Sequence, residues 1–385
     1  MLRKIKISNY KMFRDFEMDF TEGINLICGP NGSGKSALRE LLSALGNLLA
    51  LPDVAERVAE SVVSSFPAEV FCRWLPQETG YNEIIISLEL NGKDEKSGAE
   101  ELYCYDLTVR YNFLERKSRI QSESLVLHTT NRKHTIVSFA NGKLTICTDD
   151  GKDLSFSADW NVSGLVTGSR NNSKIIKFGQ LMSNVLSVHL NPSLMARDFT
   201  AGSQTIGQFG ENFAAWNFYN TIRQLNKQLL VFEQCKHFIP GFVTISNPSV
   251  GDSYRCKVSV GYNGKTYELA LSELSDGQKI LFALYSILSN VPDGSTVLID
   301  EPENFLSPGE LQPWLNAVNS AWEERDIQFI IISHNPKILN WYHKEAVILK
   351  ISDKPPRIIA EKNSADPSVS LFDKLREMEW MENGA

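Results

Sequence analysis

One stretch near the start of the chain has the residue types and the spacing to bind a triphosphate. It consists of Gly29, Pro30, Asn31, Gly32, Ser33, Gly34, Lys35 and Ser36. An apolar run precedes it and a helix-like run follows, which is the context that the pattern G-x-x-x-x-G-K-[ST] needs. The glycines let backbone N–H groups converge on an anion, Lys35 can reach the β- and γ-phosphate oxygens, and the Ser36 hydroxyl is placed to ligate Mg²⁺. We therefore expect a nucleotide and Mg²⁺ to bind here; the alternative is a glycine-rich turn that carries a lysine by chance.

Two adjacent acids could supply the chemistry at such a nucleotide. The apolar run 296–299 ends in Asp300 and Glu301. In an open α/β sheet the carboxyl end of a buried strand faces the ligand crevice. Asp300 can then hold Mg²⁺ through water, and Glu301 can orient or deprotonate the water that attacks the γ-phosphorus. The alternative is a buried strand that ends in two solvated acids.

Two further features gain meaning from their order along the chain. Ser275, Gly277 and Gln278 stand at the start of a long apolar helix, where N–H groups and the helix dipole can meet an anion. Alone, they would be an ordinary helix cap. His334 ends another apolar strand and could donate a hydrogen bond to the γ-phosphate, although a histidine in this place is usually structural. Because they follow the phosphate loop and flank the acid pair, we expect both features to act on the nucleotide.

The composition is that of a chain that folds without disulfides. With 385 residues, 42% of them apolar, it has core-forming material for one large or two ordinary domains. Its six cysteines form no C-x-x-C pair and no zinc spacing, which predicts reduced thiols in a cytoplasmic protein. The first residues lack an apolar signal core, and no run approaches the ~18 apolar residues of a membrane span, so no membrane partner is expected. The net charge of −7 argues against wholesale coating of nucleic acid.

The order of the predicted elements indicates an α/β fold. Two strands at 3–10 and 16–20 lead to the phosphate-loop strand, and a helix follows Lys35 to about residue 50. From 83 to about 177, short strands joined by Asn-Gly and Asp-Gly turns predict an antiparallel β region. This region contains no heptads, so a long coiled coil is excluded. Residues 208–238 have helical periodicity, and three strands at roughly 241–247, 254–262 and 265–270 follow them.

The motifs together resemble those of the ABC-type ATPase superfamily. That superfamily carries, in order, a Walker A loop, here 29–36, an LSDGQ signature, here 274–278, a Walker B strand, here 296–301, and a switch histidine, here His334. The N-terminal segment resembles the RecF/SMC branch. The segments VLIDEPENFLSP and IIISHNPKIL resemble stand-alone predicted ATPases, of the AAA type, that are related to the overcoming-lysogenization-defect (OLD) family and to phage-defence ATPases.

This resemblance implies a P-loop NTPase fold of the ABC-head type, with a mixed or parallel core sheet. The nucleotide-binding core would comprise residues 1–50 and 265–385. An inserted antiparallel β region would occupy 51–180, and a helical lobe leading to the signature would occupy 181–264. The resemblance also implies roles for single residues: Lys35 and Ser36 on phosphate and Mg²⁺, Asp300 on Mg²⁺, Glu301 as catalytic carboxylate and His334 as γ-phosphate sensor.

The resemblance further implies a dimer around ATP. In such proteins two heads sandwich two nucleotides, and Ser275 and Gly277 of one subunit close on the nucleotide held by the other. A homodimer or a higher even assembly is therefore expected. Relatives carry a glutamine after the strand that precedes the helical lobe, and the best candidate for that place is Asn191, a possible metal ligand. A second departure is Ser307-Pro308, where relatives often have a histidine before the proline.

The implied function is an ATP-hydrolysing switch or sensor that regulates a separate effector, such as a nuclease or toxin, in anti-phage defence. Residues 335–385 are too few for a metal-dependent nuclease domain, so the effector is expected on another chain. The main alternative is a RecF-like DNA repair ATPase that clamps DNA. An ATP-driving transporter subunit fits poorly with the long strand-rich stretch before the signature. A non-hydrolysing ATP sensor conflicts with the complete set of chemical residues.

Overall fold

The computed structural model describes residues 1–51, 59–73, 80–94, 97–130, 132–352, 357–363 and 370–382. The chain divides into two compact units. The first consists of Met1–Leu186, Ser295–Val297 and His334–Ala385, and the second of Ser187–Gly294 and Leu298–Ser333. Among the described helices none is long and apolar enough to cross a membrane.

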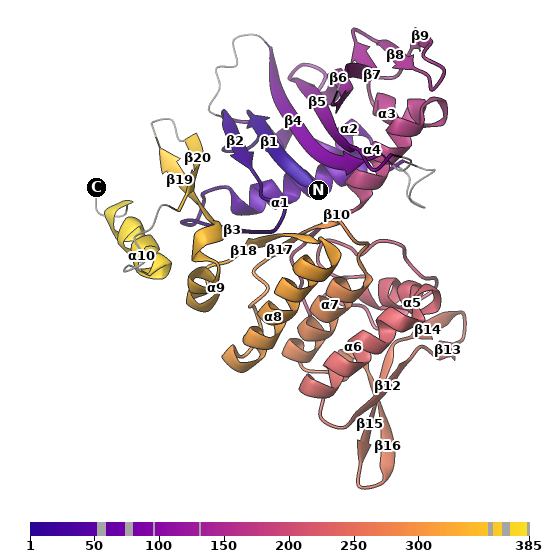
Figure 1. The fold of residues 1–385 in the computed structure, drawn as a ribbon, viewed down its shortest axis with the longest axis vertical. Helices are drawn as coiled ribbons and strands as arrows, with labels where there is room; N and C mark the ends of the chain where they lie inside the picture. The colour runs from indigo at the N-terminus through magenta and orange to yellow at the C-terminus, as the bar shows by residue number, and fades with distance from the viewer. Residues whose placement is uncertain are drawn as a thin grey trace. The chain divides into compact units, whose positions relative to one another are not determined.

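An antiparallel sheet of eight strands dominates the first unit (Figure 1). In spatial order its strands are β2 (Phe16–Asp19), β1 (Leu2–Ser8), β4 (Tyr81–Lys93), β5 (Glu100–Asn112), β6 (Lys117–Thr129), β7 (Arg132–Ala140), β8 (Lys143–Cys147) and β9 (Asp153–Ser157). The long central strands alternate between buried and more exposed residues, so that Tyr103, Tyr105, Leu107 and Val109 of β5 all face the core. This alternation is what a sheet covered on a single face requires.

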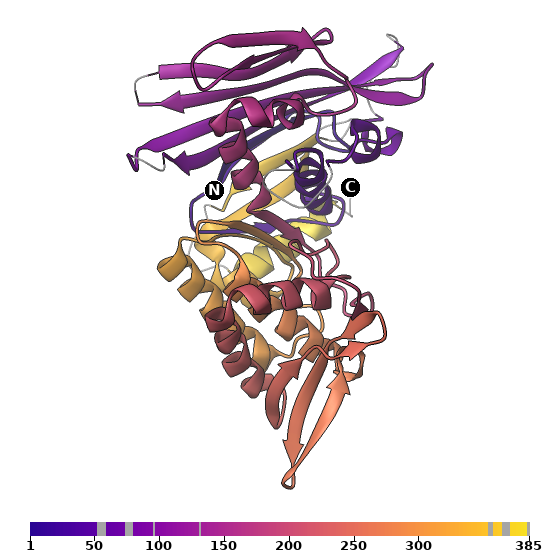
Figure 2. The ribbon, with the colours of Figure 1, turned by 90° about the vertical axis from the view of Figure 1, so that its right-hand side faces the viewer.

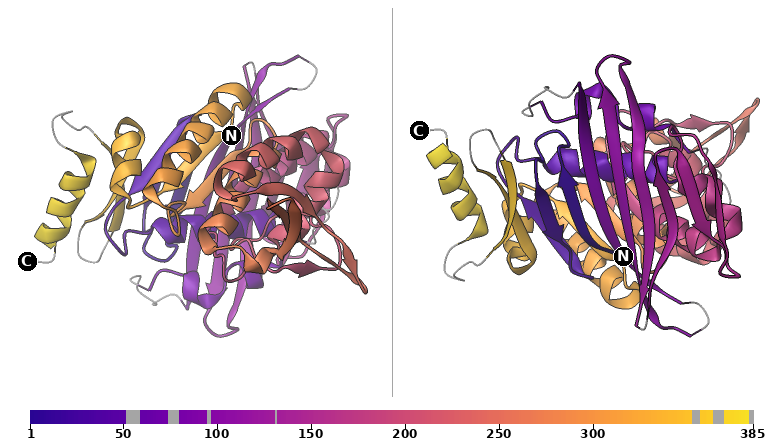
Figure 3. Two further views of the ribbon diagram at one scale, coloured as in Figure 1. Left: turned by 90° about the horizontal axis from the view of Figure 1, so that it is seen from below. Right: turned by 90° about the horizontal axis from the view of Figure 1, so that it is seen from above.

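Four helices cover the face of this sheet that carries the buried residues. The opposite face is uncovered in the view from above (Figure 3). The helices are α1 (Lys35–Leu48), α2 (Val62–Ser65), α3 (Gly164–Gly168) and α4 (Ser173–Ser183); short 3₁₀ turns are η1 (Ala68–Val70) and η2 (Ser169–Asn171). Helix α1 is amphipathic and buries Leu38, Leu41 and Leu45. Burial of this apolar stripe stabilises the helix where its own propensity would not suffice.

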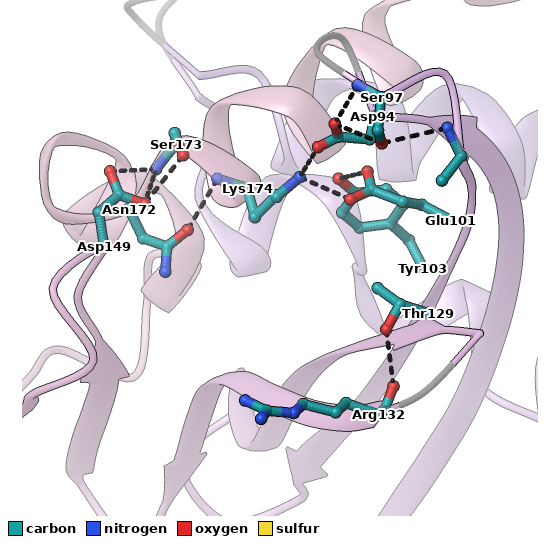
Figure 4. Close-up of polar contacts among 11 residues, drawn as sticks. Asp94, Ser97, Glu101, Tyr103, Thr129, Arg132, Asp149, Asn172, Ser173 and Lys174 are labelled. Atoms are coloured by element: carbon teal, nitrogen blue, oxygen red, sulfur yellow. Dashed lines mark hydrogen bonds and ion pairs between the residues drawn. The ribbon is translucent and has the colours of Figure 1, made fainter.

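A partly buried ion-pair cluster links α4 to the β4–β5 hairpin (Figure 4). Lys174 Nζ lies 3.0 Å from Asp94 Oδ2 and 2.5 Å from Glu101 Oε1, and the Tyr103 hydroxyl donates to Glu101 Oε2 at 2.9 Å. Asp149 caps the same helix by accepting from the backbone N–H of Ser173. The cluster therefore holds the helix in register with the sheet through charged groups that satisfy one another.

The first unit also carries the strand that precedes the phosphate loop. β3 (Ile24–Cys28) runs parallel to β19 (Ala346–Ser352), and β19 pairs antiparallel with β20 (Arg357–Lys362). All five residues of β3 are buried, as expected for a strand of a parallel sheet covered on both faces. The remaining elements are α9 (Pro336–Trp341), η4 (His343–Glu345) and α10 (Leu371–Glu382).

The second unit is mainly helical (Figure 2). Its helices are α5 (Phe213–Arg223), α6 (Leu225–Phe238), α7 (Asp276–Asn290) and α8 (Pro308–Arg325), with the 3₁₀ turn η3 (Leu271–Glu273). Helix α7 is buried from Ile280 to Leu288, because α5, α6 and α8 all pack against it. The longest described helix, α8, has 18 residues, so no long coiled coil occurs within the described residues.

Three further groups of strands lie wholly or partly in the second unit. β10 (Val185–Val188), β17 (Thr296–Asp300) and β18 (Gln328–Ile332) are successive neighbours in one sheet. The two small antiparallel sheets have the orders β11 (Asp198–Phe199), β14 (Ser253–Arg255), β13 (Ser249–Val250) and β12 (Phe242–Ser246), β15 (Lys257–Tyr262), β16 (Lys265–Ala270). The predicted fold class, an α/β protein with an antiparallel β region, a helical lobe and no long coiled coil, is confirmed. The predicted division into three segments stays a prediction.

Candidate functional site

The phosphate loop joins β3 to α1 through backbone that only glycine adopts easily. Gly29, Gly32 and Gly34 have φ values of 150°, 81° and 90°. A Cβ on Gly29 would overlap the carbonyl oxygen of Leu349, and one on Gly34 would lie 2.8 Å from Cζ of Phe13. A side chain at either position would therefore be excluded by both conformation and space. Gly34 forms the N-cap of α1, so the N–H groups of its first turn, which have no acceptor within the helix, belong to Lys35, Ser36 and the residues after them.

Lys35 is held over this loop by the loop's own carbonyl groups. Its Nζ donates to the carbonyl oxygens of Gly29 and Pro30, at 2.8 Å each, and its surface is only 8% exposed. Pro30 also accepts from the N–H of Ser33, which closes the turn. The ammonium is thus placed where the loop N–H groups and the helix dipole converge, and phosphate oxygens could replace the carbonyls as its acceptors.

The predicted signature residues form a complete cap at the start of α7. Ser275 Oγ accepts from the N–H of Gln278, and Gln278 Oε1 accepts from the N–H of Ser275. Gln278 also donates from Nε2 to the carbonyl oxygen of Phe238, which ties the cap to α6. Ser275 is exposed although most of α7 is buried. The helix therefore presents a fixed, accessible serine at its positive end.

Gly277 lies against the loop that follows the acid pair. A Cβ at Gly277 would lie 2.8 Å from the carbonyl oxygen of Phe305, closer than side chains normally approach a backbone atom. Phe305 has a φ of 71° and a half-exposed ring. The glycine is therefore needed for a close approach of two backbones, one at the signature and one in the loop after β17.

The acid pair stands at the end of β17, whose five residues are all buried. Asp300 is 6% exposed, and its Oδ2 lies 3.5 Å from Nδ1 of His189. Glu301 has a left-handed backbone, with φ of 52°. Its N–H donates to the carbonyl oxygen of Ile332 on β18, and its Oε2 accepts from Nδ2 of Asn304 at 2.9 Å. The two carboxylates thus have different environments: Asp300 is buried, and Glu301 is more accessible and is oriented by an amide.

Two predicted residues lie in loops that follow strands. Asn191 comes shortly after β10; its N–H donates to the carbonyl oxygen of Phe209, and its Oδ1 accepts from the N–H of Ser193. His334 follows β18 and the fully buried Ser333, whose hydroxyl donates to Glu303 Oε1 at 2.6 Å. Asn335, next in the chain, caps α9 through Lys337 N–H. The roles of Asn191 on metal and of His334 on phosphate stay predictions.

The predicted site residues are thus distributed over both units. The first unit holds the phosphate loop and His334, and the second holds Asn191, Ser275, Gly277, Gln278, Asp300 and Glu301. Sequence reasoning missed the contacts of His189, Asn304 and Phe305. His189 directly follows an apolar strand, and this position at a strand end was the available signal in the sequence. Nothing in the sequence marks the positive φ of Phe305.

No cluster of three or more His, Cys, Asp or Glu side chains able to hold a metal ion is found among the described residues. The oxygen donors that the sequence suggests for Mg²⁺, the Ser36 hydroxyl and the Asp300 carboxylate, are chemically suited to it, since Mg²⁺ prefers oxygen ligands and is commonly held by one or two carboxylates with phosphates and water. All six cysteines are free thiols, and five of them are buried.

The strand, glycine loop and lysine-bearing helix, together with an acid-ended buried strand and a capped signature helix, define a P-loop ATPase domain. A family model described as "AAA domain, putative AbiEii toxin, Type IV TA system" matches residues 24–340. The chain therefore belongs to this family of AAA domains, which confirms the predicted ATPase class. Membership in an AAA family implies that the chain binds nucleotide.

Solved structures of SMC head domains are similar at low identity. One SMC head, bound to the C-terminal winged-helix domain of ScpA, is 16% identical with a TM-score of 0.49, over 94% of this chain and 98% of that chain. The head from Thermotoga maritima is 15% identical with a TM-score of 0.39, over 94% and 99%. The head from Pyrococcus furiosus, with an extended coiled coil, is 13% identical with a TM-score of 0.45, over 99% of each chain. No curated protein sequence matches the chain significantly.

Proposed function

We propose that this chain binds and hydrolyses ATP with Mg²⁺ in a head-to-tail homodimer and thereby acts as a switch for a separate effector protein. The observation that carries the proposal is the backbone of Glu301. A left-handed conformation is unfavourable for a residue other than glycine, by about 1 kcal/mol or more. This one lies directly after Asp300 and is retained by a hydrogen bond to β18 and by Asn304. Backbone strain that the surrounding structure maintains in this way clusters at functional sites.

In the proposed cycle the phosphate loop binds ATP. Backbone N–H groups at the start of α1 hold the phosphates, and Lys35 exchanges its carbonyl partners for phosphate oxygens. Ser36 and Asp300 would hold Mg²⁺, which when bound neutralises charge on the β- and γ-phosphates. Glu301, oriented by Asn304, accepts the proton of the attacking water, and His334 donates a hydrogen bond to the γ-phosphate.

The exposed tip of α7 supports the dimer. Ser275 and Asp276 are exposed at the start of a helix that is otherwise mostly buried. The reciprocal cap with Gln278 fixes the serine, so that a second subunit could meet its hydroxyl and the helix dipole without further ordering. In this proposal, Ser275 and Gly277 of each subunit complete the nucleotide site of the other.

The family description supports a toxin-linked role. It names a putative toxin of a type IV toxin–antitoxin system, so a role in a toxin-linked or anti-phage system fits the family. We propose that ATP-dependent closure of the dimer restrains or releases such an effector, a nuclease or toxin, in the cytoplasm. The proposal includes the predicted division of the chain into a nucleotide-binding core, an inserted β region and a helical lobe.

The variant Glu301→Gln tests the proposal. Glutamine keeps the size of the side chain and can still bond to Asn304, but it cannot accept a proton, so phosphate release should fall by roughly 10²- to 10⁴-fold. ATP-bound dimers should accumulate in light-scattering measurements. The matched control is Glu324→Gln, which changes an exposed acid on α8 of the same unit. Wild-type turnover in Glu301→Gln would refute the catalytic assignment, and a monomer in ATP for every variant would refute the dimer.

A further inference from the structure

His189 and Asp300 meet at the ends of two neighbouring strands. β10 and β17 are adjacent in their sheet, and where β17 begins the N–H of Thr296 donates to the carbonyl oxygen of Asn184, at 3.0 Å, just before β10. His189 directly follows β10, and Asp300 is the last residue of β17. The two strands therefore run side by side in the same direction, which brings the imidazole Nδ1 to 3.5 Å from Asp300 Oδ2.

The imidazole is held in this orientation by its surroundings. The backbone N–H of His189 donates to the carbonyl oxygen of Gln208 at 2.8 Å. Its ring stands edge-on to Phe209, with 6.3 Å between ring centroids and planes 83° apart. Nδ1 is buried and has no hydrogen-bond partner within normal distance. A buried ring nitrogen without a partner is costly, and the Asp300 carboxylate is the charged group that it faces.

The neighbouring Asn191 is engaged differently. Its side-chain oxygen already accepts from Ser193 in a turn, and its backbone is bonded to Phe209. It therefore acts in the structure as a turn residue, whereas His189 directs an uncommitted polar atom at the acid pair. Of His189 and Asn191, it is His189 that lies close to a predicted Mg²⁺ ligand, Asp300.

We propose that His189 is a positioning residue for Asp300: its imidazole donates a hydrogen bond from Nδ1–H to Oδ2 and thereby orients the carboxylate toward hydrated Mg²⁺. The inference rests on the proposed function, since it assigns Asp300 to the metal. Partners of this kind orient a ligand without touching the metal or the substrate, and their loss typically weakens metal affinity or activity about 10- to 100-fold.

The variants His189→Asn and His189→Gln separate this positioning role from a general packing role. Asparagine can place an N–H donor near the position of Nδ1, whereas glutamine places its donor near that of Nε2. His189→Leu removes the donor altogether. The matched control is His237→Ala, which changes an exposed histidine on α6 of the same unit.

The measurement uses the full chain and needs no turnover. ATP binding is titrated by calorimetry at a series of Mg²⁺ concentrations and again in EDTA, which yields the Mg²⁺ concentration for half-maximal enhancement of binding. We expect this concentration to rise at least about 10-fold in His189→Leu and His189→Gln. It should stay near wild type in His189→Asn and in the control, and affinity in EDTA should be the same in all variants. Thermal unfolding without nucleotide checks that each variant is folded.

The outcomes distinguish this inference from the proposed function. If wild type binds Mg²⁺-ATP and His189→Leu keeps the wild-type Mg²⁺ dependence, the positioning role is refuted and the ATPase proposal stands. Equal losses in the asparagine and glutamine variants also refute it, because donor position would then be irrelevant. If His189→Leu does not fold, the comparison of asparagine with glutamine decides. Failure of wild type to bind ATP in any condition refutes the proposed function and this inference together.

Discussion

Replacing Gly277 by alanine tests whether the start of α7 and the loop after β17 are coupled through their closely approaching backbones. The new Cβ would lie 2.8 Å from the carbonyl oxygen of Phe305. A backbone oxygen cannot rotate away as a flexible side chain can, so either the start of α7 or the loop after β17 must move. Because Asn304 and Glu301 belong to that loop and are hydrogen-bonded to each other, the displacement should reach the Glu301 carboxylate, the proposed catalytic group.

The size of the effect follows from two opposing terms. Alanine in a helix is favoured over glycine by about 1 kcal/mol. Overpacking against a close neighbour typically costs about 1–3 kcal/mol. Gly46 in α1 offers the matched case, since nothing lies within 4 Å of its Cβ position. We therefore expect Gly46→Ala to raise the free energy of unfolding by about 0.5–1 kcal/mol, and Gly277→Ala to leave it unchanged or lower it by up to about 2 kcal/mol.

Urea unfolding of each variant, followed by tryptophan fluorescence, measures stability, and phosphate release measures turnover. Gly277→Ala should lose turnover because Glu301 is displaced, whereas Gly46→Ala should keep the wild-type rate. If Gly277→Ala is stabilised as much as Gly46→Ala and hydrolyses ATP normally, the close approach of the two backbones has no energetic consequence and the reasoning is wrong.

Two other predictions concern stability. Arg325 donates to the carbonyl oxygens of Leu288 and Val291 at the end of α7 and pairs with Asp293. Arg325→Gln should therefore lower the free energy of unfolding, measured from the urea midpoint, by about 2 kcal/mol. The exposed Arg223→Gln, which loses a cation–π contact with the Tyr219 ring, should lower it by at most about 1 kcal/mol, so equal losses would contradict the assignment. Burial raises the pKa of the Glu123 carboxyl above its usual 4.5, although hydrogen bonds to its two oxygens oppose the rise. Since the pKa is higher in the folded state, the stabilising contribution is complete below pH 4.5 and is lost as pH rises through the folded pKa. The stability of wild type relative to Glu123→Gln should therefore fall from pH 4.5 upwards in paired urea titrations, and a difference that grows with pH would overturn this.

The local parts of the candidate site could be predicted from the sequence. Glycine spacing determines the phosphate loop, because the positive φ values at Gly32 and Gly34 are ones that few other residues adopt. Ser275 and Gln278, three residues apart before an apolar helix, indicate the reciprocal cap that the structure contains. An apolar run that ends in acids indicates the buried strand β17. Each of these signals depends on residues close together in the chain.

The contacts that orient the side chains of the candidate site depend on pairing between segments that are distant in the sequence. The positive φ of Glu301 is retained by hydrogen bonds to β18 and Asn304, and the need for glycine at 277 comes from the carbonyl of Phe305. His189 meets Asp300 only because β10 and β17 are neighbours in register. The sequence by itself determined the chemical groups and the local backbone that carries them. Tertiary structure alone decided which groups face one another, because strand order and register arise from packing of the whole core and leave no signal at any single residue.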